Sequence, residues 1–118
     1  MSMPKRILVV DDNIEFLRLL SSLLQKQFQT YEATGVEDAL KVLETVTVDA
    51  ICSDLNMGDG TGLELLQKLR LADSHIPFLL MSGMNDYFII SEVESYGAQF
   101  CAKTDLDLLM KIKAMAHE

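Results

Sequence analysis

The chain has 118 residues, 49% of them hydrophobic and 24% charged, which is typical of one globular domain that buries its own core. Eighteen acidic residues against ten basic ones give a net charge of −8, which argues against direct binding to nucleic acids or anionic membranes. No apolar run reaches the length of a signal peptide or membrane span, and Cys52 and Cys101 lack partners at metal-ligand spacing. We therefore expect buried free thiols and a cytoplasmic location.

The first half of the chain alternates between strand and helix patterns. The continuous apolar run 7–10 predicts a buried strand, and apolar residues then recur at helical spacing over 14–24. Residues 28–33 predict a second strand. Residues 34–37 have the pattern of a capping box, with Thr34 as the cap and Glu37 as its partner, and predict a helix that continues to residue 43.

The second half repeats the alternation three times. Strands are predicted over 49–54, 77–81 and 99–102, and helices over 62–71 and 85–96, the latter ended by Gly97. Thr104 or Asp105 is expected to cap a last helix that runs through Leu106 to Met115. The tally is five strand–helix units.

Strictly alternating units of this kind predict an α/β fold with a parallel five-stranded sheet and helices on both faces. The strand segments are almost continuously apolar, as burial on both faces requires. No linker, repeat or low-complexity segment interrupts the pattern, so we expect a single domain over residues 1–118.

Acidic residues follow two of the predicted strands. Asp11 and Asp12 end the first strand and Asp54 ends the third, and ligands of open parallel sheets bind beyond these carboxyl ends. If the two strands are neighbours, three carboxylates converge there and repel one another. Mg²⁺, which prefers hard oxygen ligands, would reverse that repulsion.

Two further polar residues are predicted at the same edge. Ser82 ends the fourth strand and Lys103 follows the fifth. Carboxylates, a divalent cation, a lysine and a hydroxyl together suit a phosphoryl group, with Asp54, nearest the middle of the sheet, as the nucleophile.

Four motifs together resemble the receiver domain of bacterial two-component response regulators. They are "ILVVDDN" (7–13), "SDLNMGDGTG" (53–62), "LLMSG" (79–83) and "GAQFCAK" (97–103), in order along the chain. The resemblance implies a flavodoxin-like, doubly wound sheet of order 2-1-3-4-5. It also implies a signalling switch that catalyses only its own phosphorylation and dephosphorylation and is no enzyme with an independent substrate.

The resemblance implies a role for each matched residue. Asp54 would accept a phosphoryl group from a histidine kinase or phosphotransfer protein. Asp12, Asp54 and the main-chain carbonyl of Asn56 would bind Mg²⁺ directly, and Asp11 through water. Lys103 would pair with the phosphoryl oxygens.

The resemblance also implies a conformational readout. Ser82 would hydrogen-bond the attached phosphoryl group and draw its loop inward, and Phe100 would rotate into the space that this movement vacates. The altered surface would be the fourth helix, fifth strand and fifth helix, facing a downstream effector protein or domain, with a homodimer formed on phosphorylation as a further option.

Three departures from the family pattern carry expectations. Gly58 stands where the family usually has Pro, so ordering the loop should cost more and Mg²⁺ should bind more weakly. Thr104 also replaces a usual Pro, which predicts a trans peptide bond after Lys103. The segment 97–103 is one residue shorter than the common pattern, which leaves the role of Phe100 open.

Two other functions compete with the switch. A pseudo-receiver would keep the fold and bind partners without phosphorylation, although the full set of acidic, hydroxyl and lysine residues argues against it. A phosphatase of the haloacid dehalogenase type would need a general acid two residues after its nucleophile, where this chain has Asn56, whose amide cannot donate that proton.

Overall fold

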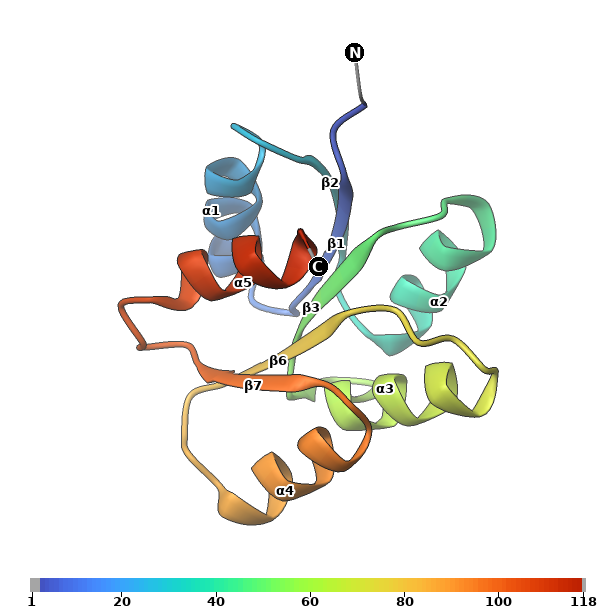
Figure 1. Ribbon diagram of the computed structural model, residues 1–118, viewed down its shortest axis with the longest axis vertical. Coiled ribbons are helices and arrows are strands. Elements are labelled where there is room, and N and C mark those ends of the chain that lie inside the picture. Colours follow the sequence, from blue (N-terminus) through green and yellow to red (C-terminus); the bar gives the residue numbers. More distant parts are fainter. Residues whose placement is uncertain (1–2, 118) are drawn as a thin grey trace.

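The five-stranded sheet is parallel throughout and has the strand order β2-β1-β3-β6-β7 (Figure 1). The structure is a computed structural model that describes residues 3–117; residues 1, 2 and 118, which the predicted domain includes, lie outside the described residues. The order corresponds to the predicted 2-1-3-4-5. The strands are β1 (Arg6–Val10), β2 (Gln29–Ala33), β3 (Ala50–Asp54), β6 (Phe78–Ser82) and β7 (Gln99–Ala102).

Helices cover both faces of this sheet (Figure 1). They are α1 (Ile14–Leu24), α2 (Val36–Thr45), α3 (Gly62–Leu71), α4 (Tyr87–Ser95) and α5 (Leu108–Ala116). Buried side chains of α1 and α5 pack on one face, and those of α2, α3 and α4 on the other, so the central strands are buried from both sides as predicted. None of the helices within residues 3–117 combines the length and hydropathy that a membrane span requires.

The thiols of Cys52 and Cys101 are free and buried, as the sequence predicts. Burial raises the pKa of both thiols, so they stay protonated near neutral pH.

The start of α2 differs from the prediction. The N-cap residue is Gly35, one residue after the expected Thr34, and it has no side chain to cap the helix. The Thr34 main-chain N–H donates to Asp38, and not to the expected Glu37. The predicted capping box is therefore wrong, because the first-turn N–H groups of α2 receive their acceptor from a distant loop, described below.

The start of α5 also differs. The helix begins at Leu108 with Asp107 at the N-cap, so neither Thr104 nor Asp105 caps it, and the predicted helical residue Leu106 is fully exposed before it. Asp105 instead accepts a hydrogen bond from the main-chain N–H of Asp107 and forms an ion pair with Lys111. This local turn satisfies the carboxylate without extending the helix.

Between β3 and α3 the chain forms a short antiparallel hairpin that the sequence did not predict. Strand β4 (Asn56–Met57) pairs with β5 (Gly60–Thr61), and Gly58 and Asp59 make the connection. Thr61 then caps α3 by accepting from Glu64. The hairpin begins two residues after Asp54, so it lies next to the carboxyl end of β3.

Candidate functional site

Three carboxylates converge at the carboxyl edge because β1 and β3 are adjacent parallel strands. Asp11 and Asp12 follow β1 and Asp54 ends β3, and each offers an oxygen within 4.8 Å of the others. Asp11 and Asp54 are buried, whereas Asp12 is exposed. The predicted convergence of the acidic residues is confirmed.

The backbone around Asp54 is fixed by close packing. The next residue, Leu55, donates to the carbonyl of Met81 on β6 and accepts from the N–H of Gly62 at the start of α3. A Cβ at Gly62 would lie 2.3 Å from the carbonyl oxygen of Asp54, so only glycine lets the helix approach this closely. Asp54 is therefore held between β6 and the first turn of α3.

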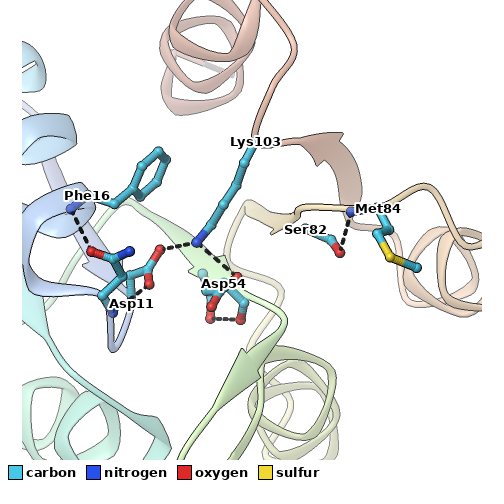
Figure 2. A network of polar contacts seen from close by, with 8 residues as sticks. Asp11, Phe16, Asp54, Ser82, Met84 and Lys103 are labelled. Atoms are coloured by element: carbon cyan, nitrogen blue, oxygen red, sulfur yellow. Dashed lines mark hydrogen bonds and ion pairs between the residues drawn. The ribbon is translucent and has the colours of Figure 1, made fainter.

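Lys103 reaches the acidic cluster from the end of β7, the edge strand two positions away from β3 in the sheet (Figure 2). Its main-chain N–H donates to the carbonyl of Ser82, which continues the pairing of β7 with β6. Its ammonium lies 2.7 Å from Oδ2 of Asp11 and 3.3 Å from Oδ1 of Asp54, and 4.5 Å from the centre of the Phe16 ring. The peptide bond to Thr104 is trans, as predicted, and Lys103 still enters the site.

The charged groups of the site shift one another's pKa values. Burial raises the pKa of Asp54, the charge of Asp11 raises it further, and Lys103 only partly offsets these effects. Burial disfavours the charged form of Lys103, but its hydrogen bond to Asp11 and the charge of Asp54 outweigh this, so its pKa is raised. Lys103 therefore stays cationic beside a carboxylate pair that still carries excess negative charge.

Ser82 is buried at the end of β6, and its hydroxyl accepts a hydrogen bond from the main-chain N–H of Met84 (Figure 2). A surface pocket of about 470 Å³ opens beside it, between the hairpin, α3 and the start of α4, and includes Asn56 and Met84 in its lining. Phe100, partly buried, packs against the core on the α4 side of the sheet. Ser82 thus lies at the predicted edge, whereas Phe100 lies further back along β7.

The donor set fits a divalent cation. Three carboxylates within 4.8 Å of one another supply hard oxygen ligands, and Asn56 follows Asp54 by two residues, at the mouth of the hairpin. One buried carboxylate oxygen, Oδ2 of Asp11, has the Lys103 ammonium, at 2.7 Å, as its one polar partner among the described residues.

Two residues of the site had no predicted role. Phe16 was counted as part of the apolar stripe of α1, and nothing in that pattern indicates that its ring lies under Lys103. Asp59 lies within the motif 53–62 but was given no function, although its carboxylate accepts from the N–H groups of Val36 and Glu37. No local pattern in the sequence indicates this contact, because Thr34 offers a capping side chain next to Gly35 and Asp59 lies 23 residues beyond Val36.

Comparison with protein families gives an independent result. The family model of the response regulator receiver domain matches residues 7–112. Sporulation initiation phosphotransferase F of Bacillus subtilis is 27% identical over 108 residues, covering 89% of this chain and 87% of that protein. Regulatory protein VirG of Agrobacterium tumefaciens is 35% identical over 82 residues, covering 67% of this chain but only 30% of its own length. The chain thus spans most of the first relative and less than a third of the second.

Solved structures agree in fold. A CheY-like receiver domain protein from Methanospirillum hungatei superposes with a TM-score of 0.88 at 24% identity, covering 97% of this chain and 94% of that chain. The chemotaxis response regulator CheY4 of Vibrio cholerae gives 0.84 at 25% identity, covering 98% and 99%. These superpositions cover nearly the whole chain.

Proposed function

The chain belongs to the family of response regulator receiver domains of two-component systems, and we propose that Asp54 is the residue through which it is phosphorylated. Receiver domains act as phosphoacceptor switches and not as enzymes with an independent substrate. The observation that carries the proposal is the position of Asp54, buried beside Asp11 and Asp12 and within 3.3 Å of the Lys103 ammonium. We take residues 1–118 as one receiver domain.

In the proposed reaction, one carboxylate oxygen of Asp54 attacks the phosphorus of a phosphohistidine, and the imidazole of the donor leaves. Asp12, Asp54 and the carbonyl of Asn56 would hold Mg²⁺ directly, with Asp11 acting through water. When bound, Mg²⁺ supplies positive charge that offsets the repulsion between the carboxylates and the phosphoryl oxygens. Lys103, already cationic and directed at Asp54, would bind a phosphoryl oxygen on the other side.

The signal would then pass through Ser82. Among the described residues its hydroxyl only accepts, from the N–H of Met84 at 3.3 Å, so its own proton can be donated to a phosphoryl oxygen in a charge-assisted bond. The resulting movement of the loop before α4 would let Phe100 rotate inward. The surface of α4, β7 and α5 would in this way report phosphorylation to an effector.

The partners follow from the family. Receivers interact with histidine kinases or phosphotransfer proteins and with effectors, and we propose one donor and one effector of these kinds for this chain. The net charge of −8 supports a protein partner rather than nucleic acid. We place this exchange in the cytoplasm.

The pseudo-receiver alternative is not favoured, because the complete acidic cluster and its lysine are assembled in one place. The haloacid dehalogenase alternative fails on Asn56, whose side chain cannot act as the general acid.

Intact-mass spectrometry after incubation with acetyl phosphate and Mg²⁺ tests the proposal. We expect one phosphoryl adduct, which disappears in Asp54→Asn and when EDTA removes the metal. An adduct that persists in Asp54→Asn would assign phosphorylation to another residue. A folded wild-type protein that gains no adduct and binds no Mg²⁺ would establish the pseudo-receiver.

A further inference from the structure

The first turn of α2 takes its hydrogen-bond acceptor from the hairpin after β3. Oδ1 of Asp59 accepts from the N–H of Val36 at 2.9 Å, and Oδ2 accepts from the N–H of Glu37 at 3.0 Å. These N–H groups have no partner within their own helix. One carboxylate therefore caps a helix that begins 23 residues earlier in the chain.

Gly35 leaves the space that this carboxylate occupies. Its backbone is extended, with φ of −174°, so its conformation does not require glycine. A Cβ at this position would instead lie 2.6 Å from Oδ1 of Asp59. The missing side chain at Gly35 thus makes room for the Asp59 carboxylate, which caps the helix in its place.

The same carboxylate holds the tip of the hairpin. Met57, on one strand, is buried in the core, and Gly60, on the other, packs against Val36 of α2. Gly58 lies between them, and a Cβ built on it would meet no atom within 4 Å, so a side chain at this position would find no packing partner there. Asp59 supplies the polar attachment between this turn and the rest of the domain.

The hairpin also leads to the metal site. Asn56 begins it and pairs with Thr61, and Asp12, Gly58 and Asp59 line one surface pocket of about 350 Å³. We propose that Asp59 is a positioning residue, which attaches the hairpin to α2 so that the carbonyl of Asn56 is held ready for Mg²⁺. The inference rests on the proposed function, in which that carbonyl is a ligand.

Three variants separate positioning from helix capping and from charge. Asp59→Ala removes the carboxylate. Gly35→Ala keeps every charge but displaces the carboxylate by sterics. In the double variant Asp59→Ala/Gly35→Ser, the new serine caps α2 locally, in the space left by the carboxylate, but does not hold the hairpin. Asp49→Ala is the control, because it removes one acidic charge and one acceptor for a main-chain N–H, that of Arg6, at the opposite edge of the sheet.

Two quantities are measured for each variant: Mg²⁺ affinity by calorimetry and the midpoint of thermal unfolding without Mg²⁺. We expect Asp59→Ala to bind Mg²⁺ about tenfold more weakly, at the lower end of what loss of a group supporting a metal ligand costs. Gly35→Ala should weaken binding in the same direction. The double variant should recover the unfolding midpoint while Mg²⁺ affinity stays low, and Asp49→Ala should bind Mg²⁺ as the wild type does.

The phosphorylation rate gives a second readout. With acetyl phosphate, Asp59→Ala should need more Mg²⁺ to reach its half-maximal rate but should approach the wild-type rate at saturating Mg²⁺. Unchanged Mg²⁺ affinity in Asp59→Ala, or recovery of both quantities in the double variant, overturns the inference while the proposed function stands. If the wild type itself binds no Mg²⁺, the proposed function fails and the inference with it.

Discussion

The Lys103 ammonium lies 2.7 Å from Oδ2 of Asp11, a side chain with no exposure to solvent. A buried carboxylate is costly unless a cation or hydrogen-bond donors compensate it. The main-chain N–H of Asn13 donates to Oδ1 of Asp11, and the positive charge of Lys103 compensates Oδ2. In the metal-free protein Lys103 therefore compensates the cluster that is proposed to bind Mg²⁺.

Replacing this lysine should destabilise the metal-free protein. Lys103→Met leaves Asp11 without its cation, and we expect a loss of roughly 2 kcal/mol, less than for a fully buried pair because the lysine is partly exposed. Urea denaturation in EDTA measures the change. Lys111→Met is the matched control, since its ion pair with Asp105 is equally short but more exposed and should contribute far less.

Mg²⁺ should reverse much of that loss. A cation bound beside Asp11 replaces the missing positive charge, so adding Mg²⁺ should raise the unfolding midpoint of Lys103→Met more than that of the wild type. Phosphorylation by acetyl phosphate should nevertheless be slower in the variant, because the phosphoryl oxygens lose a partner. An equal Mg²⁺ response in both proteins would contradict a shared role of the lysine and the metal in neutralising Asp11.

A substitution at Gly62 should act on Asp54 through the backbone. The added Cβ of Gly62→Ala meets the carbonyl of Asp54 at 2.3 Å and the side chain of Leu80 at 2.8 Å. We expect a loss of about 2 to 3 kcal/mol from overpacking, and slower adduct formation because Asp54 moves. Gly83→Ala, whose Cβ meets no described atom within 4 Å, should keep the wild-type stability. Equal stabilities of the two variants would show that α3 yields easily.

A substitution at Gly58 should stabilise the protein, in contrast to one at Gly62. Its Cβ position is open, so Gly58→Ala should cost no packing and should reduce the freedom of the unfolded chain. We expect about 0.5 kcal/mol of added stability and tighter Mg²⁺ binding, because less ordering of the loop remains to be done. Calorimetric titration with Mg²⁺ measures the second effect. Unchanged affinity would mean that the hairpin is already ordered in the metal-free protein.

The sequence predicted the strands, and the edge of the sheet at which the acidic residues lie, because both depend on patterns local to each strand. A continuous apolar run indicates a buried strand whose last residues lie at the carboxyl edge, so Asp11, Asp54 and Lys103 could be placed at one edge; that they meet there depends on the strand order. The strand order came from the family resemblance and is confirmed.

The wrong cap of α2 and the missed role of Phe16 both originate in contacts between distant segments, whereas the wrong cap of α5 reflects a local turn around Asp105. The cap of α2 was assigned to Thr34, the nearest suitable side chain, whereas the acceptor comes from Asp59. Phe16 fits an apolar stripe, and only the arrival of Lys103 from β7 gives its ring a cationic partner. Helix-capping rules describe a segment and its neighbours in sequence, so they cannot indicate an acceptor from another loop.

The capping carboxylate of Asp59 predicts a specific pH dependence. The N–H groups of Glu37 and Val36 lower the pKa of Asp59 in the folded protein. Its contribution to stability is therefore complete above the unfolded pKa of an aspartate, about 4, and is lost as the pH falls through the lower folded value. Asp59→Asn offers only one acceptor oxygen and should unfold at a lower temperature than the wild type at pH 7.

That difference in unfolding temperature should stay constant from neutral pH down to about pH 5 and shrink below about pH 4. Thermal unfolding of both proteins across this range, without Mg²⁺, measures it. Asp107→Asn controls for the loss of one acidic charge, since Asp107 is the N-cap of α5 but its side chain makes no capping hydrogen bond. A difference that stayed the same below pH 4 would mean that protonated Asp59 still caps α2 and that its negative charge contributes nothing to stability.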